Sequence, residues 1–408
     1  MPVDVLRCRV CESDYPALAN GICVRCFGPL EPVYHWDEIA ARVSRESIEA
    51  GPYSLWRYAE LLPATPPPGA ESGPGFTPLV PAPRLASALG VGEVLLKLDI
   101  ANPTHSFKDR VVAVAAAKAV EFGFETLSCT STGNLANAVA ARAATLGMPA
   151  VIFCPAGLEP EKMLATTVYG ARVYGVRGSY DDCSRLISEL AGEVEWGFVN
   201  VNLRSYYAEG SKTLSFEIIE QLGWESPDAI VAPIASGAMF SKLWQGFEQF
   251  GRLGLIGEQR PRLYGGQAEG CAPVATAFAE ERRVSPVRPN TIARSLGIGN
   301  PADGDLAIAT ARASGGAIHS VPEEDIGSNM ALLAETSGVF GETAAGVTVG
   351  ALRAAVAAGQ IGESDRVVAL VTGTGLKTPQ AVEDEVTGTL VEVEADIDAL
   401  LDELGVTA

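Results

Sequence analysis

Histidine is scarce in this sequence, with only three among 408 residues. His35, His105 and His319 are too few for a multi-histidine catalytic metal centre, and they leave little room for a Ser-His-Asp triad. The motifs G-x-S-x-G, H-E-x-x-H and G-x-x-x-x-G-K-[ST] are absent, and a G-x-G at residues 373–375 lacks the third glycine of a dinucleotide fingerprint. These absences argue against the common hydrolases, zinc proteases and P-loop enzymes.

Positive charge and long apolar runs are also in short supply. Lys and Arg number 30 against 50 Asp and Glu, which gives a formal net charge of −20 and makes nucleic acid and membrane surfaces poor partners. No apolar run reaches the ~18 residues of a membrane-spanning helix. Met1 to Val10 has no apolar core, so we expect no signal peptide, a cytoplasmic location and eight reduced cysteines.

Four of the cysteines form two pairs near the N-terminus. Cys8 and Cys11 make one C-x2-C knuckle, and Cys23 and Cys26 make a second after eleven residues. Each knuckle places two thiolates on one tight turn, and four thiolates satisfy a tetrahedral ion. We predict a closed, structural zinc site over residues 1–36. Iron, an empty site and disulfides are the alternatives.

A proline-rich loop over Pro63–Pro74 precedes a long region in which strands alternate with helices. The strands are near-continuous apolar runs, which favours a doubly wound α/β fold with mostly parallel sheets. The acidic tail, Val391–Ala408, has apolar residues at helical spacing. Predicted strands are Glu125–Thr130, Ala150–Cys154, Ala171–Val176, Val199–Asn202, Ile230–Ile234 and Val367–Val371, and predicted helices are Gly133–Leu146, Pro160–Tyr169 and Tyr180–Ala191.

In such folds ligands bind where strands end, so the turns there are the candidates for chemistry. Asn102–Arg110 leads into a predicted helix, Val111–Val120, with Ser106 and Asp109 at capping-box spacing. Lys108 falls in the first helical turn, where the helix dipole is expected to lower the pKa of its amine, as a covalent or general-base lysine requires. A solvated lysine at a helix start is the alternative.

Three further turns offer hydroxyls, glycine or free backbone amides. Ser131, Thr132 and Gly133 form a seat for a carboxylate at a helix start, and Ser236–Met239 lets backbone amides approach a phosphate. Thr372, after a strand, offers a hydroxyl to a neutral ring nitrogen. Each turn alone is equally typical of an ordinary capped helix start or glycine-rich turn.

Together these turns resemble the threonine synthases. The resemblance rests on Asn-Pro-Thr-x-Ser-Phe-Lys-Asp-Arg, Ser-Thr-Gly-Asn and Thr-Gly-x-Gly-Leu-Lys in this order, and it covers roughly residues 76–380. Threonine synthases belong to the fold-type II pyridoxal-phosphate enzymes, the tryptophan-synthase β-like group. The N-terminal four-cysteine ribbon is similar to that of archaeal-type members.

The resemblance implies a role for each motif residue. Lys108 would hold pyridoxal 5'-phosphate covalently and move protons. Asn134 would bind the ring hydroxyl, and Thr372 would face the pyridine nitrogen. Ser131 and Thr132 would receive the substrate carboxylate. The cofactor phosphate would be held by Ser236, Gly237, Ala238 and Met239.

The resemblance also implies an α/β fold of two doubly wound open-sheet domains plus the small zinc ribbon. A homodimer is expected by the same analogy. The small domain is expected to be mobile and to close over the substrate. The expected boundaries are 1–36 for the ribbon, 37–108 and 203–390 for the large cofactor-binding domain, 109–202 for the small domain, and 391–408 for the tail.

The substrate-phosphate segment departs from the family pattern. Tyr207 stands where a phosphate-binding arginine is expected. Arg204, three residues upstream, and Lys212 are the replacement cations we expect, with Arg204 preferred because a guanidinium suits a bidentate phosphate. A surface role for Arg204 is the alternative.

The expected activity is conversion of O-phospho-L-homoserine and water into L-threonine and phosphate. One alternative is a cysteate-synthase-like replacement at the β-carbon of phosphoserine, or a related β/γ-elimination. The other is a cofactor-free regulatory homologue that uses the ribbon to bind partners, which an intact Lys108, Asn134 and Thr372 argue against.

Overall fold

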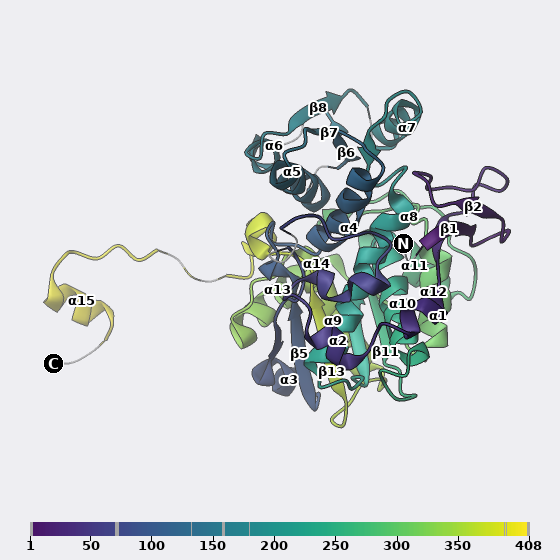
Figure 1. The fold of residues 1–408 in the computed structure, drawn as a ribbon. Helices are drawn as coiled ribbons and strands as arrows, with labels where there is room; N and C mark the ends of the chain where they lie inside the picture. Colours follow the sequence, from purple (N-terminus) through teal and green to yellow (C-terminus); the bar gives the residue numbers. More distant parts are fainter. Residues whose placement is uncertain are drawn as a thin grey trace.

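The computed structural model describes residues 3–69, 73–131, 133–156, 160–178, 180–386, 388 and 390–405. Within these residues the chain forms three sheets, in a ribbon, a larger lobe and a smaller lobe (Figure 1). The ribbon sheet has the order β2-β1-β3 and is antiparallel. Its strands are β1 (Val3–Cys8), β2 (Asp14–Pro16) and β3 (Leu30–Tyr34).

The larger sheet has the order β12-β11-β10-β13-β5-β4 and is parallel except for its edge strand β4. Successive residues of its strands point into two different cores. Ile230 and Ala232 belong to one, and Ala229 and Val231 to the other. The strands are β4 (Leu79–Pro81), β5 (Glu93–Leu98), β10 (Ala229–Pro233), β11 (Arg262–Ala268), β12 (Ile318–Val321) and β13 (Arg366–Val371).

Helices cover both faces of this sheet, which confirms the doubly wound α/β architecture. One face carries α9 (Thr213–Gln221), α10 (Ala238–Arg252), α11 (Pro273–Ala279) and α12 (Gly304–Ala313). The other carries α3 (Pro83–Leu89), α13 (Glu323–Ser337) and α14 (Thr343–Ala357).

The smaller sheet, β8-β7-β6-β9, is entirely parallel. All four strands fall between residues 127 and 198, inside the range expected for the small domain. The strands are β6 (Leu127–Thr130), β7 (Ala150–Pro155), β8 (Arg172–Val176) and β9 (Gly197–Phe198), and the helices of this region are α4 (Lys108–Glu121), α5 (Asn134–Leu146), α6 (Pro160–Thr167) and α7 (Tyr180–Leu190).

The predicted strand Val199–Asn202 is wrong, because these residues form turns. The Asn202 side chain accepts from the Phe198 N–H at 2.9 Å and donates to the Trp196 carbonyl at 2.9 Å. An asparagine that bonds its own neighbouring backbone closes a turn in place of extending a strand.

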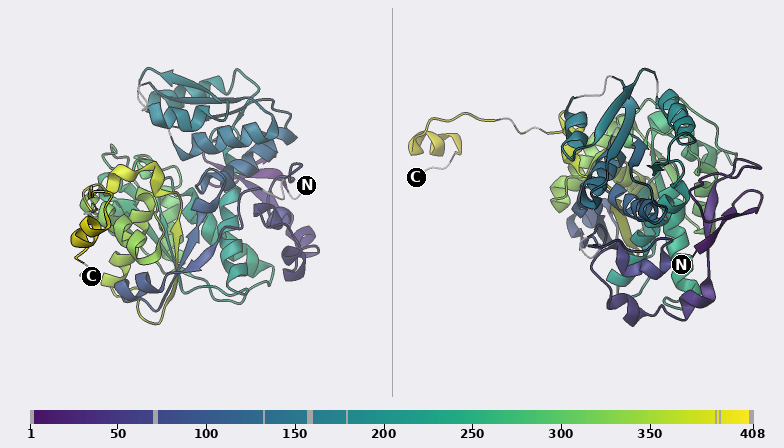
Figure 2. Two further views of the ribbon diagram at one scale, coloured as in Figure 1. Left: turned by 90° about the vertical axis from the view of Figure 1, so that its left-hand side faces the viewer. Right: turned by 45° about the horizontal axis from the view of Figure 1, so that its top comes forward.

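The C-terminal helix α15 (Ile397–Glu403) lies apart from both lobes at the end of an extended segment (Figure 1). Turned by 90°, the molecule shows the smaller lobe above the larger one (Figure 2, left). Leu6 and Leu30 of the ribbon pack in one buried cluster with Val112 on α4. No helix in the described part of the chain has the length and apolar character needed to cross a bilayer.

Candidate active site

The lysine loop and the Thr372 turn meet at the carboxyl end of the larger sheet. The Phe107 N–H donates to the Thr372 carbonyl at 2.8 Å, and Ser106 forms an isolated bridge with Gly373. Lys108 is the first residue of α4, directly after this junction. The two motifs, more than 260 positions apart in sequence by their numbering, therefore form one surface.

The amine of Lys108 has no hydrogen bond or ion pair among the described residues. Its Nζ lies 5.4 Å from the ring centroid of Phe107 and 5.9 Å from that of Tyr207. The side chain is half-buried. A lysine amine near two aromatic rings, with no ion pair among the described residues, is available for a covalent bond to a carbonyl ligand.

The predicted capping box at the start of α4 is wrong. Phe107 occupies the cap position in a helical conformation and provides no side-chain cap. Asp109 instead turns back, and its Oδ2 accepts from the Thr104 N–H at 2.8 Å and from the Thr104 hydroxyl at 2.9 Å. Ser106 Oγ is buried and, among the described residues, has no hydrogen-bond partner. The acidic residue thus holds the loop that carries the lysine.

Asn134 begins α5 and reaches from the small lobe across to the large one. Its Nδ2 donates to Glu342 at 3.0 and 3.2 Å, and its Oδ1 accepts from Lys377 Nζ at 2.7 Å. Lys377 also donates to the Thr104 carbonyl at 2.6 Å. The amide of Asn134 is therefore held in one orientation by a carboxyl on one side and an ammonium on the other.

Glu342 and Lys377 were not assigned a role from the sequence. Lys377 ends the quoted Thr-Gly-x-Gly-Leu-Lys motif, so a signal was present. Glu342 precedes α14 and looks like any acidic residue at a helix start. Burial raises the pKa of the Glu342 carboxyl and lowers the pKa of the Lys377 amine, since each charge is removed from water.

The loop Ser236–Met239 follows β10 and opens the 15-residue helix α10. Gly237 has φ +92°, and a Cβ there would collide with the Asp303 carbonyl oxygen. The Asp303 N–H donates to the Ser236 carbonyl at 2.9 Å. A glycine-containing loop at the start of a long helix presents backbone amides to an anion.

The predicted carboxylate seat lies at the start of α5. Ser131 N–H donates to the Phe153 carbonyl at 2.9 Å, and Ser131 Oγ accepts from the Gly133 N–H at 3.2 Å. Thr132 lies outside the described residues. In the described part of this turn, the Ser131 hydroxyl already accepts a hydrogen bond from its own loop.

Lys212 does not line a site open to substrate. Its side chain is 0% exposed, and its ammonium donates to the Tyr34 hydroxyl at 2.9 Å, to the Leu61 carbonyl at 3.1 Å and to Glu209 at 2.6 Å. Burial lowers the pKa of Lys212 to about 8. All three of its protons are used inside the protein, so the expectation that Lys212 binds the substrate phosphate does not agree with this geometry.

Arg204 lies at the start of α8 (Arg204–Tyr207), one helical turn before Tyr207. Its Nη2 donates to Asp303 Oδ2 at 2.7 Å, and its side chain is 27% exposed. It lines a small pocket with Arg9, Ala238 and Lys242. The guanidinium therefore lies near the start of α10, with one of its five donors bonded to Asp303.

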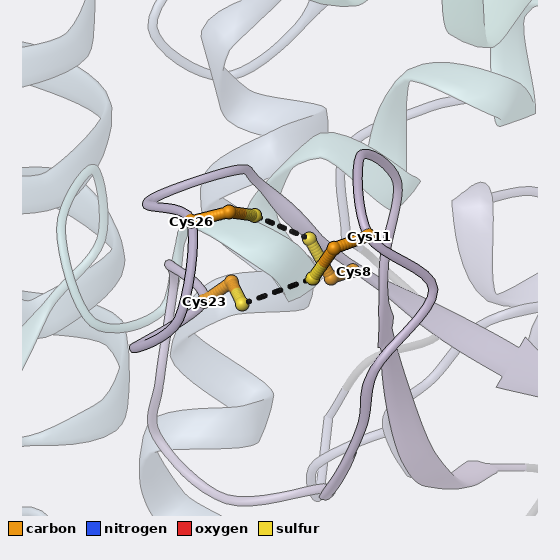
Figure 3. A group of neighbouring side chains, drawn as sticks. All are labelled: Cys8, Cys11, Cys23 and Cys26. Carbon is orange, nitrogen blue, oxygen red and sulfur yellow. Dashed lines mark hydrogen bonds between the residues drawn. The ribbon is translucent and has the colours of Figure 1, made fainter.

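The four N-terminal cysteines come together as expected. Their sulfurs all lie within 4.8 Å of one another, with Cys8–Cys26 at 3.4 Å and Cys11–Cys23 at 3.6 Å (Figure 3). Four thiolates on a tetrahedral zinc ion, at ~2.3 Å each, would be about 3.8 Å apart. The spacing fits a tetrahedral metal site with no open position.

Residues 70–373 match a family described as "Pyridoxal-phosphate dependent enzyme". The threonine synthase of Methanocaldococcus jannaschii is 35% identical over 92% of this chain and 93% of its own length, and that of Methanosarcina acetivorans is 35% identical over 97% of each. The chain belongs to the threonine synthases, a group of pyridoxal-phosphate-dependent enzymes.

Solved structures support the fold of this pyridoxal-phosphate-dependent enzyme. Diaminopropionate ammonia lyase from Escherichia coli has a TM-score of 0.65 at 20% identity, with 77% of this chain and 89% of that chain covered. Threonine deaminase isoform 2 from Solanum lycopersicum has a TM-score of 0.64 at 18% identity, with 86% and 89% covered. These likenesses show the fold-type II arrangement.

The residues present fit pyridoxal phosphate. The cofactor needs an unengaged amine, a phosphate seat and polar contacts to its ring. Lys108, the loop Ser236–Met239 and the pair Asn134 and Thr372 are of these types, and the loop opens the long helix α10. Ser106 Oγ, buried beside the Thr372 turn, is a further polar atom without a hydrogen-bond partner among the described residues.

Proposed function

We propose that this chain converts O-phospho-L-homoserine and water into L-threonine and phosphate. One observation carries the proposal. The unengaged Lys108 amine lies at the junction that joins its own loop to Thr372, the latter at the end of β13. The 35% identity with curated threonine synthases over nearly the whole chain supports the same reaction.

Pyridoxal phosphate supplies an electron sink for the carbanion formed at the substrate α-carbon. Lys108 would hold the cofactor, give way to the substrate amine, and then take the proton from Cα and return it. Asn134, fixed by Glu342 and Lys377, would orient the ring through its hydroxyl. Thr372 would contact the ring nitrogen as a neutral hydroxyl, and Ser131 and Thr132 would receive the substrate carboxylate.

Release of the substrate phosphate needs a cation in a site with little water. We propose Arg204 for this role, since α8 also carries Tyr207 beside Lys108 and most of the Arg204 donors remain for a ligand. Closure of the small domain over the large one would exclude water until the addition step. Asn134 already joins the two lobes through Glu342.

A second candidate is replacement at the β-carbon of phosphoserine. The observation behind it is Tyr207, which lies beside Lys108 and stands where the family pattern has a phosphate-binding arginine. The cofactor residues would be the same in both reactions, so only the amino-acid substrate distinguishes them.

The test is to supply the purified protein with O-phospho-L-homoserine and identify the amino acid formed by mass and chirality, together with released phosphate. We expect threonine and phosphate in equal amounts, and no product from Lys108→Ala. Phosphate released only from phosphoserine with an added nucleophile would move the assignment to β-replacement.

We further propose that the ribbon holds a structural zinc ion and that the enzyme is a cytoplasmic homodimer. The four-cysteine cluster supports the metal, and the net charge of −20 is consistent with an enzyme that avoids membranes and nucleic acid. Elemental analysis for zinc tests the metal site, and the molecular mass measured by light scattering tests the homodimer.

A further inference from the structure

The ribbon reaches the large lobe through a residue inside its first metal-binding knuckle. Arg9 lies between Cys8 and Cys11, and its Nη2 donates to Asp303 Oδ1 at 2.8 Å. Its other terminal nitrogen donates to Glu31 on β3 at 3.1 Å. Strand β3 of the ribbon contacts α8, and Asp303 directly precedes α12, so the Arg9–Asp303 contact spans the joint between the ribbon and the large lobe.

Asp303 connects this joint to the phosphate loop. Its backbone N–H donates to the Ser236 carbonyl at 2.9 Å, and its carbonyl oxygen fills the space where Gly237 would carry a Cβ. Its carboxylate side chain is 6% exposed and accepts from both Arg9 and Arg204. The backbone of Asp303 therefore fixes the loop, while its side chain is fixed from the ribbon and from α8.

A second contact ties the ribbon to the same helix. Lys242, in the second turn of α10, lies 3.6 Å from Glu31 and pairs with buried Glu209. Burial alone would raise the pKa of Glu209, but Lys212 and Lys242 lower it to about 2, so the carboxylate stays charged within this cluster. The start of α10 is thus held from the ribbon at two points.

We propose that the ribbon positions the loop that receives the cofactor phosphate, with Arg9 and Asp303 as positioning residues. The proposal rests on the assignment of Ser236–Met239 to that phosphate. A loop already held with its amides toward the ligand binds without a reordering cost. Loosening Arg9 from Asp303 therefore weakens binding of a phosphate-bearing ligand and leaves binding of the same ring without phosphate unchanged.

The test compares Arg9→Gln with Arg25→Gln in the full-length, zinc-loaded protein. Arg25 occupies the second knuckle, and its guanidinium donates to Ser13 Oγ at 3.1 Å, within the ribbon itself. After the cofactor is stripped, the dissociation constants of pyridoxal 5'-phosphate and of pyridoxal are measured by absorbance titration. In Arg9→Gln we expect the constant for pyridoxal 5'-phosphate to rise at least about fivefold and that for pyridoxal to stay unchanged. Arg25→Gln should change neither.

Asp303→Asn weakens the same ion pair from the large-lobe side. It is therefore the control for an Arg9→Gln effect caused by loss of the metal ion. It should show the same selective loss, and the double variant should be no weaker than Asp303→Asn alone. Equal losses for both ligands, or normal pyridoxal 5'-phosphate affinity in both single variants, would overturn the proposal. Wild-type protein that binds pyridoxal as tightly as pyridoxal 5'-phosphate would instead overturn the loop assignment itself.

Discussion

At the residue scale, the fold raises the pKa of Glu342. This carboxyl is 4% exposed, accepts from Asn134, and faces the ammonium groups of Lys377 and Lys108. Burial outweighs these stabilising contacts and raises its pKa above the usual value of 4.5. The pKa of Glu342, the residue bonded to the proposed ring-binding Asn134, is thus set by its burial.

The raised pKa of Glu342 predicts a pH-dependent stability difference from Glu342→Gln. Between the unfolded and folded pKa values the folded protein binds more protons than the unfolded chain, so wild-type stability falls as pH rises through this window. The glutamine variant lacks this term. We expect the variant to gain stability relative to wild type as pH rises from about 4.5, and the difference to level off above the folded pKa.

Urea unfolding of the cofactor-free wild type and of Glu342→Gln, at several pH values between about 4.5 and 8, measures this difference in the free energy of unfolding. A stability difference that does not change with pH would show that Glu342 ionises normally. Asn134 and Lys377 remain in both proteins, so the comparison isolates the carboxyl.

At the element scale, a buried ionic cluster fixes the start of α4. Arg110 pairs with Asp99, after β5, at 2.8 Å and with Glu217 on α9. Lys97 on β5 pairs with Glu217 at 2.7 Å. These four side chains are at most 2% exposed. The helix that carries Lys108 is therefore anchored to a strand and to a second helix two residues beyond the lysine.

Removal of Arg110 leaves two buried carboxylates and one buried cation, so one negative charge has no counter-charge. We expect Arg110→Met to lower the free energy of unfolding by about 3–5 kcal/mol. The matched control is Arg185→Met, because Arg185 is 66% exposed and pairs with Glu189 one turn along α7; there we expect about 0–1 kcal/mol. Urea denaturation of both variants measures the difference, and equal effects would mean that the buried cluster adds no more than a surface pair.

At the scale of the whole molecule, the C-terminal segment is separate from the two lobes. Its apolar side chains are exposed, with Leu390 at 89%, Ile397 at 64% and Leu404 at 63%. The last residues packed against the larger lobe are near Ala381 and Val382. The catalytic lobes therefore form without the tail.

Truncation after Leu390 should leave the free energy of unfolding within about 0.5 kcal/mol of wild type. The rate of threonine formation should also be unchanged, since no proposed site residue lies beyond Lys377. Denaturation and steady-state assays of the shortened chain check both. A marked loss of either would mean that the tail docks on a lobe or on a second subunit.

The sequence alone determined the class of fold, the cysteine cluster and the lysine loop. Strand runs such as 150–154 and 367–371 are apolar throughout and bounded by turn residues, so local pattern specifies them. The knuckles Cys8–Cys11 and Cys23–Cys26 carry their ligand spacing within a few residues. These features depend on neighbours along the chain, which a sequence displays directly.

Only the tertiary structure decided which charges meet. Lys212 and Arg204 were both expected at the substrate phosphate. Lys212 is enclosed with Glu209 and Tyr34, whereas Arg204 pairs with Asp303 and stays partly exposed. Asp303 itself carries no sequence signal. Long side chains reach partners hundreds of positions away, and burial, not spacing, sets whether a cation remains open to a ligand. The role of the ribbon at the phosphate loop follows from such a contact.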